Sequence, residues 1–378
     1  MISSENIKIF ILNPTFVDRG NASKTLVANH NSILANEYGK SDGIKDISQV
    51  LVRMGFDVEI VNITLENFEE CLDYIENDDA VLSNRKVVFQ LCDGLESDGF
   101  PGISVVQSLQ SRGMSFTGAG DIFYLTTTSK PDLKRACIEN HVPTGEFVEI
   151  NVEEEIEGQV LMAEAIVGYP MIVKPSVSYA SLDITDKSIV LTRSQTIQQC
   201  REVLQNQQQG GGGVFLESFL AGREFTALVT GDERHGIRVY DVAERVFNKN
   251  LKTFQRILAF DRYWDGFTLD GCNGTQKEPL YWYEKAPEQE QEQIKAVALK
   301  AYIACNGSGY GRVDMRTRTM DDYRVVVLEV NANCGLTFDK DASSLGQILH
   351  LSRVDPSEFV QELINYARCR ERKSRNTN

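Results

Sequence analysis

Three oxygen-bearing side chains interrupt the apolar runs of a predicted β-hairpin between residues 311 and 338. Asp314, Glu329 and Asn331 stand where a strand usually carries Val or Ile. If the hairpin turns at residues 321–322, Asp314 lies opposite Glu329 and Arg312 lies opposite Asn331, with all four side chains on one face. Facing carboxylates repel each other, but a bound Mg²⁺ would reverse that repulsion. The pattern fits a metal site, and it also fits a hairpin face exposed to solvent, where acids are common.

Two lysines upstream are candidates for binding an anionic ligand. Lys174 ends a predicted strand, and the loop after it is rich in small and hydroxyl residues, among them Ser176, Ser178 and Ser181. Such a loop can bring backbone N–H groups close to phosphates. Lys130 stands at the start of a predicted helix. Each lysine alone also fits a solvated strand end or helix start.

Glu217 and Glu224 flank a short turn between two apolar segments. Taken alone, this pair fits an exposed connection as well as a binding site. Arg312 is a further cation beside the acidic residues of the hairpin, where it could bind phosphate or stabilise an oxyanion.

The elements that carry these residues follow a regular order. Strand and helix patterns alternate through the first third of the chain, with strands over 7–13 and 84–94 and a helix that ends near Gly55 before another strand. This order predicts a mostly parallel, doubly wound α/β sheet. Sites in such sheets lie at the carboxyl ends of the strands, and the loop over 92–102, which contains Asp93, is in that place.

A change of pattern near residue 121 predicts a second unit. We expect an N-terminal domain over 1–120, a central lobe over 121–212, a C-terminal lobe over 213–366 and a flexible tail over 367–378. The long polar segment 244–284 is the natural lid of the C-terminal lobe. A helix over 287–306, with Pro287 near its start, precedes the hairpin.

The composition is typical of a soluble protein with an acidic balance. Hydrophobic residues make up 42% and charged residues 25%, and a net charge of −15 argues against nucleic acid as the main partner. No apolar run approaches the roughly 20 residues of a membrane span. Eight widely spaced cysteines without a Cys-x-x-Cys pair indicate reduced thiols and a cytoplasmic location.

The order and spacing of these motifs resemble the ATP-grasp superfamily, most closely its D-alanine–D-alanine ligase branch. The matching motifs are Lys130 with Lys134, "IVKPS" at 172–176, "LESFLAGREFT" at 216–226, "GYGRVDM" at 309–315 and "VLEVNANCGLT" at 327–337. The resemblance covers roughly residues 85–350. It implies a Rossmann-like, pre-ATP-grasp domain followed by two α+β lobes that hold ATP between them.

The resemblance implies a role for each nucleotide-site candidate. Lys130, Lys174 and Ser176 would contact the phosphates, and the loop with Ser178 and Ser181 would close over them. Glu217 and the backbone of Phe219 and Leu220 would hold the adenine edge, and Glu224 would hold the ribose hydroxyls.

The resemblance also makes the hairpin a metal site. Asp314, Glu329 and Asn331 would hold two Mg²⁺ ions, with Mn²⁺ as a substitute, and Arg312 would stabilise charge at the acyl centre. The implied reaction is attack of a carboxylate on the γ-phosphate of ATP, followed by attack of an amine on the acyl phosphate. Such a transfer depends mainly on positioning and charge neutralisation.

The substrate site follows the family less closely. The first strand lacks the family's Gly-Gly and Ser-Ala-Glu motifs, the loop at Asp93 lacks the family's His, and Cys334 replaces its Pro. We therefore expect an acyl donor other than D-alanine. Further candidates for substrate contacts are the lid residues Arg256, Arg262 and Tyr263, and Ser343 or Ser344 for the acceptor's carboxylate.

The partners expected are a small-molecule carboxylate and amine, with neither nucleic acid nor a membrane, and the family also allows a homodimer. Two alternatives to an amide-forming ligase stay open. One is another ATP-grasp phosphoryl transfer with a different acceptor. The other is a nucleotide-binding protein without turnover.

Overall fold

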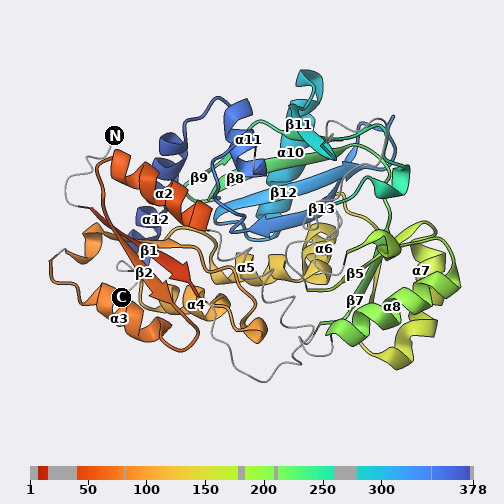
Figure 1. Cartoon of the computed structure of the whole chain (residues 1–378), viewed down its shortest axis with the longest axis horizontal. Coiled ribbons are helices and arrows are strands. Elements are labelled where there is room, and N and C mark those ends of the chain that lie inside the picture. The colour runs from red at the N-terminus through yellow and green to blue at the C-terminus, as the bar shows by residue number, and fades with distance from the viewer. Residues whose placement is uncertain are drawn as a thin grey trace, which may run out of the picture.

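The computed structural model describes residues 7–15, 41–80, 82–177, 184–207, 212–258, 279–341 and 343–374. These residues contain three β-sheets with helices packed around them (Figure 1). In that view the N-terminal sheet lies at the left, a four-stranded sheet at the right, and a six-stranded sheet between and above them.

The N-terminal sheet is parallel, with the order β2-β1-β3. Its elements are β1 (Lys8–Pro14), α2 (Ser41–Arg53), β2 (Asp57–Ile63), α3 (Phe68–Glu76), β3 (Lys86–Gln90) and α4 (Ile103–Ser111). The predicted parallel sheet is confirmed, as is the break after α2 at Gly55, which has a positive φ of 83°. After α4, Phe116 forms a single parallel bridge with Val88.

The four-stranded sheet is antiparallel, with the order β4-β7-β5-β6. Its elements are α5 (Asp121–Thr128), α6 (Lys130–Glu139), β4 (Phe147–Ile150), α7 (Ile156–Ile166), β5 (Met171–Pro175), β6 (Ile189–Val190), α8 (Arg193–Gln207) and β7 (Val214–Ser218). Met171 and Val173 share a core with α7 and α8. Lys174, from the alternate positions of the same strand, lines a cavity on the opposite side.

The six-stranded sheet has the order β11-β10-β8-β12-β13, with β9 paired to β8. Its elements are β8 (Glu224–Asp232), β9 (Gly236–Val239), β10 (Ala243–Phe247), β11 (Tyr281–Lys285), α10 (Glu288–Ala304), β12 (Gly309–Thr317), β13 (Val325–Ala332), α11 (Ser344–Leu351) and α12 (Pro356–Ser374). Short 3₁₀ helices span Ser83–Arg85, Glu96–Asp98, Glu153–Glu155, Asp186–Ser188 and Thr253–Gln255.

Four of these elements bear on the expected division of the chain. Strand β7, just past the boundary expected at 212, pairs with β4 and β5. Helix α12 continues to Ser374, beyond the expected start of a flexible tail at 367. Strands β10 and β11 form the two ends of the expected lid, whose middle part, 259–278, lies outside the described residues.

Alternate residues of β12 serve two different purposes. Val313 and Met315 are fully buried in the core that includes the apolar side of α10. Arg312, Asp314 and Arg316 face the other way and line the cavity. The period-two geometry of a strand explains how apolar and charged residues can alternate here without conflict.

The connection between β12 and β13 differs from the predicted one. Residues 318–324 join the strands, so the predicted turn at 321–322 was wrong. Beside this connection Arg316 pairs with Val326, whereas the two-residue turn would pair it with Val327. The register of this half of the hairpin differs from the predicted register by one residue.

A β-bulge at Leu328 restores the predicted register at the charged residues. Asp314 pairs with Glu329 and Arg312 with Asn331, as predicted. Because the bulge adds one residue to β13, it reverses which side chains face the cavity. Without it, Glu329 and Asn331 would continue the core-facing row of valines.

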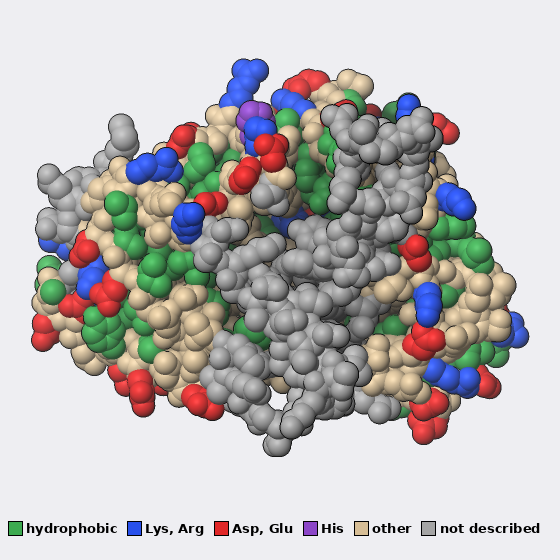
Figure 2. All heavy atoms as spheres, viewed as in Figure 1, with side chains coloured by type: hydrophobic (Ala, Val, Ile, Leu, Met, Phe, Trp, Pro, Cys, Tyr) green, Lys and Arg blue, Asp and Glu red, His purple; other side chains and the backbone are tan. Residues whose placement is uncertain are grey.

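The surface carries charges of both signs. Acidic and basic side chains are interspersed over the coloured part of the face in Figure 2. No helix among the described residues combines the length and apolarity needed to cross a membrane. The seven cysteines that the described ranges contain are free thiols.

Val313→Ala tests the packing of β12 on α10. We expect the free energy of unfolding to fall by about 2 kcal/mol, because the deleted methyl groups leave a cavity in a fully buried position. Val52→Ala is the matched control, since Val52 on α2 is 61% exposed and should change stability little. Chemical denaturation measures both, and equal effects would contradict this packing.

Candidate active site

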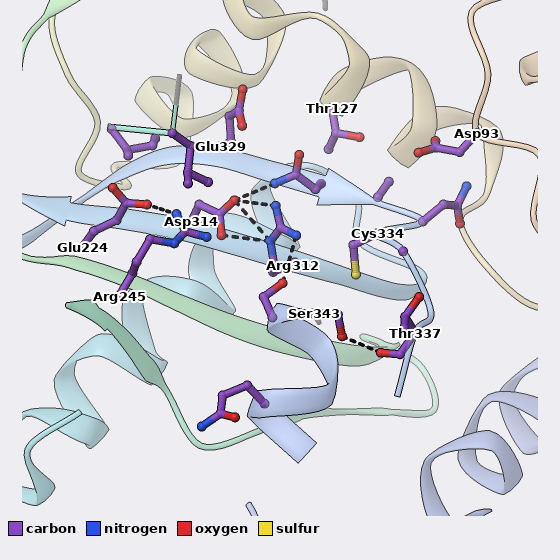
Figure 3. Close-up of a pocket in the computed structure, with 18 of the residues that line it drawn as sticks. Asp93, Thr127, Glu224, Arg245, Arg312, Asp314, Glu329, Cys334, Thr337 and Ser343 are labelled. Atoms are coloured by element: carbon purple, nitrogen blue, oxygen red, sulfur yellow. Dashed lines mark hydrogen bonds and ion pairs between the residues drawn. The ribbon is translucent and has the colours of Figure 1, made fainter. Parts of the chain in front are cut away.

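A cavity of about 750 Å³ lies where the three sheets meet. This volume is in the usual range for small-molecule sites. The loop after β3 contributes Asp93, and the six-stranded sheet contributes Glu224, Arg312 and Asp314 (Figure 3). The four-stranded sheet contributes Lys174 and Glu217. Side chains far apart in the sequence therefore meet in one space.

Helix α6 supplies two lysines one turn apart. The Ser129 hydroxyl caps the helix by accepting from the backbone N–H of Asp132 at 3.3 Å. The backbone N–H of Lys130 donates to the carbonyl oxygen of Ser176 at 2.9 Å, which fixes the start of α6 beside the end of β5. Lys130 and Lys134 are four residues apart, so they point to the same side of the helix, and both are buried.

Glu217 lies between two lysines. Its carboxylate contacts Lys174 Nζ at 2.5 Å and Lys134 Nζ at 2.8 Å, and Lys134 Nζ also donates to the Val327 carbonyl oxygen at 2.9 Å. Burial opposes ionisation, but the two ammonium charges lower the pKa of Glu217 to about 2. Glu217 therefore stays charged and holds Lys174 in place.

The backbone expected to contact adenine lies directly after this carboxylate. Phe219 and Leu220 both line the cavity. The N–H of Phe219 already donates to the carbonyl oxygen of Pro170 at 3.0 Å, so a ligand would have to use its carbonyl group instead. The adenine contacts of Glu217, Phe219 and Leu220 stay predictions.

Glu224 joins two arginines on the neighbouring strands. It pairs with Arg245 of β10, and its Oε2 lies 3.4 Å from an Arg316 nitrogen on β12. Arg245 also donates to the hydroxyl of Tyr283 on β11 at 2.6 Å. Ion pairs and a hydrogen bond thus connect a row of residues across four strands. The ribose contact of Glu224 stays a prediction.

Asp314 is the centre of the hydrogen bonds in the hairpin. Arg312 donates to both of its oxygens, at 3.0 Å from Nε and 2.8 Å from a terminal nitrogen. Asn331 Nδ2 donates at 2.9 Å and the Thr226 hydroxyl at 2.8 Å. Burial opposes ionisation of Asp314, but the Arg312 charge holds the pKa of its carboxyl below its ordinary value.

Glu329 completes the oxygen donors at this point of the sheet. It pairs with Asp314 across the strands, and its Oε1 lies 3.5 Å from Lys130 Nζ. The described residues contain no group of three or more His, Cys, Asp or Glu side chains suited to a metal. Two carboxylates with the amide of Asn331 still fit Mg²⁺, which commonly takes one or two carboxylates and completes its shell with water and substrate phosphates.

The two candidate serines have different partners. The Ser343 hydroxyl caps α11 by accepting from the N–H of Gly346 at 2.9 Å, and it donates to the Thr337 carbonyl oxygen at 2.5 Å. The Ser344 hydroxyl instead accepts from Arg312 at 3.1 Å. The structure therefore ties Ser343 to the loop before α11 and brings Ser344 to the arginine.

Of the remaining predicted residues, the structure describes three and leaves four outside the described ranges. Asp93 lines the cavity, whereas the side chain of Arg256 donates to the carbonyl oxygen of Leu251 and is not among the lining residues. Ser176 is buried beside the start of α6, and its hydroxyl has no hydrogen-bond partner among the described residues. Ser178, Ser181, Arg262 and Tyr263 lie outside the described residues.

The sequence analysis named Lys134 in a motif without giving it a role, and it missed Arg245 and Thr226. The role of Lys134 could have been inferred, because its spacing of four from Lys130 places both on one helix face. Arg245 and Thr226 carry no such signal, since they reach the site only through the pairing of β10 and β12 with β8.

Lys134→Met tests whether the buried lysine holds Glu217. We expect the free energy of unfolding to fall by about 3 kcal/mol at neutral pH, because a buried charge loses one partner. In the native chain the pKa of Glu217 is about 2, below its ordinary value of 4.5. The stability that ionised Glu217 contributes is therefore present above pH 4.5 and is lost as the pH falls towards 2.

The difference in the free energy of unfolding between the native chain and the Lys134→Met variant should therefore become smaller below pH 4.5. Lys300→Met, at an exposed position of α10, is the matched control and should change little at any pH. Chemical denaturation at pH 7, 4 and 3 measures the difference. A deficit that does not depend on pH would contradict the assignment.

Comparison with known proteins identifies a family. The family model described as D-ala D-ala ligase C-terminus matches residues 138–365, more than half of the chain. The D-alanine–D-alanine ligase of Desulforudis audaxviator (strain MP104C) is 22% identical over 263 residues, which cover 69% of this chain and 76% of that ligase.

Solved structures of such ligases share the fold. The D-alanine–D-alanine ligase from Bacillus anthracis, complexed with ATP, superposes with a TM-score of 0.63 at 18% identity, covering 97% of this chain and 99% of that one. VanG D-Ala:D-Ser ligase from Enterococcus faecalis gives a TM-score of 0.64 at 16% identity, covering 96% of this chain and 100% of that one. D-alanine–D-alanine ligases use ATP and Mg²⁺. The chain belongs to the D-alanine–D-alanine ligase C-terminal family, and it is an ATP-dependent carbon–nitrogen ligase with the ATP-grasp fold.

Proposed function

We propose that this ligase joins a small carboxylate to an amine through an acyl phosphate, and that at least one of the two substrates is an amino acid. The observation that carries the proposal is the placement of Lys130, Glu329, Asp314 and Arg312 along one cavity. Cations suited to phosphates lie at one side of the facing carboxylates, and an arginine suited to an acyl oxygen lies at the other.

The lysines and the carboxylates have different roles in binding the phosphates of ATP. The ammonium groups of Lys130 and Lys174 bind phosphate oxygens, and Glu217 keeps Lys174 oriented. Asp314, Glu329 and Asn331 are the residues that would hold Mg²⁺. When bound, Mg²⁺ neutralises charge on the transferred phosphoryl group.

Arg312 acts where the two substrates meet. A donor carboxylate oxygen forms a bond to the γ-phosphorus, and the bond to ADP breaks. The amine nitrogen then forms a bond to the acyl carbon, phosphate leaves, and the amine gives up a proton. Arg312 stabilises the negative charge on the acyl oxygen during the second step, and its bond to Ser344 keeps it oriented.

The acyl donor is expected to differ from D-alanine, because the N-terminal substrate motifs of the family are missing. Relatives of this chain include ligases named for D-alanine and for D-serine. The C-terminal half, which resembles them most, supports an amino acid as the acceptor.

Turnover with pools of substrates tests the proposal. The protein is incubated with ATP, Mg²⁺ and pools of amino acids and small carboxylates, and released phosphate and condensed products are measured. We expect release that depends on both substrates, with a product one water lighter than their sum. Release without condensation would indicate another phosphoryl transfer, and ATP binding without release in any pool would indicate a non-catalytic protein.

Glu329→Ala tests the metal assignment. We expect turnover to fall on the order of 100-fold or more while the protein stays folded, because a candidate Mg²⁺ ligand is lost. Glu292→Ala, at an exposed position of α10, is the matched control and should keep full turnover. Phosphate release and circular dichroism measure activity and folding, and unchanged activity of the first variant would refute the assignment.

A pair of alanine variants separates the two serines. Ser343→Ala should lower the free energy of unfolding by about 1 kcal/mol through loss of the helix cap. Ser344→Ala should leave stability nearly unchanged but lower kcat, since Arg312 loses a partner. The reverse result would exchange the roles of the two residues.

A further inference from the structure

One end of the cavity contains an acid that has no cation beside it among the described residues. Asp93, in the loop after β3, lies at the same end as Cys334 and Thr337, while Glu224 and Glu329 lie at the other (Figure 3). Its carboxyl makes no hydrogen bond or ion pair with the described part of the chain, and it is half-buried. Every other acid named above in the cavity is paired with a lysine or an arginine.

Two neighbouring polar groups are also unsatisfied. Tyr310 on β12 is fully buried and lines the cavity, yet its hydroxyl has no hydrogen-bond partner among the described residues. The same holds for Nδ2 of Asn333, which is 6% exposed. Buried polar groups are nearly always paired, so groups of this kind facing a cavity indicate a ligand or ordered water.

The pKa shifts of Tyr310 and Asp93 agree with their placement along one cavity. Burial raises the pKa of the Tyr310 hydroxyl, and the charges of Cys334 and Asp93 raise it further. Burial likewise raises the pKa of Asp93 well above its ordinary value. A cation brought by a ligand would reverse that shift by stabilising the carboxylate.

The distance to the acyl centre limits the size of the ligand. Tyr310 and Arg312 lie on the same side of β12, two residues apart, which is about 7 Å along a strand. A carboxylate at Arg312 and a cationic group at Asp93 would therefore belong to a small molecule with its two charged groups a few bonds apart. A small amino acid meets this description.

We propose that Asp93 binds the ammonium group of the acyl donor, with the Tyr310 hydroxyl beside it, so that the donor is an amino acid. This inference rests on the proposed ligase function. A donor without an amine would leave Asp93 unpaired in a cavity from which water is displaced, and a dicarboxylate would place two negative charges together. Both cost binding free energy.

Asp93→Asn provides the test, because it removes the charge and keeps the shape. The wild-type protein and the variant are titrated calorimetrically with the common amino acids in both enantiomers, and with the same acids lacking the amine, such as propionate in place of alanine. We expect at least one amino acid to bind the wild type clearly better than its amine-free analogue. Its affinity should fall on the order of 100-fold in the variant, while the analogue's affinity does not fall.

Two further variants sharpen the result. Tyr310→Phe should weaken the amino acid less than Asp93→Asn does, because it removes one neutral hydroxyl. Asp79→Asn, at an exposed position that does not line the cavity, is the matched control and should bind as the wild type does.

The readouts separate this inference from the proposed function. Equal binding of amine-free analogues, unchanged affinity in Asp93→Asn, or no binding of any amino acid would overturn the assignment of Asp93. Amine-dependent binding with no condensed product would retain the assignment and refute the ligase function. For the active enzyme, Asp93→Asn should raise the KM of the donor and leave the KM of ATP unchanged.

Discussion

Charge compensation in a buried space is the constraint on which the rest of this structure depends. Glu217 stays ionised only because Lys134 and Lys174 lie beside it, and Asp314 does so because of Arg312. Removing either partner would leave an uncompensated charge, which is strongly destabilising. The positions of α6, β5, β7 and β12 are therefore linked through their charged side chains as well as through their apolar cores.

The same arrangement prepares the site for a highly charged ligand. In the proposed function Lys174 binds phosphate and must keep its charge in the cavity. The ion pair with Glu217 favours this, because it raises the pKa of Lys174. The hairpin places two carboxylates opposite each other, which is unfavourable in a bare sheet and favourable once a divalent cation is bound. The repulsion of the facing carboxylates lowers the stability of the free protein, but the same charges are already positioned to bind a cation.

The sequence allowed much of this to be predicted from local patterns. The parallel N-terminal sheet, α2 with its end near Gly55, and α10 behind Pro287 follow from periodicity and from Gly and Pro signals. The pairs Asp314–Glu329 and Arg312–Asn331 were also predicted, although from a turn that does not exist. The bulge at Leu328 compensates for the longer connection, and no pattern in the sequence of a single strand indicates such a compensation.

The sequence by itself determined the order of the motifs, the alternation of charged and apolar residues along β12, and thus the family and its type of chemistry. Only the tertiary structure decided which charges compensate one another. Arg245 reaches Glu224, and Ser344 rather than Ser343 reaches Arg312, through strand pairing and the capping of α11. It also brought Asp93 to the same cavity, where no described residue pairs with it. The physical reason is that local patterns follow from the geometry of one element, whereas charge pairing depends on distances between elements that are remote in the chain.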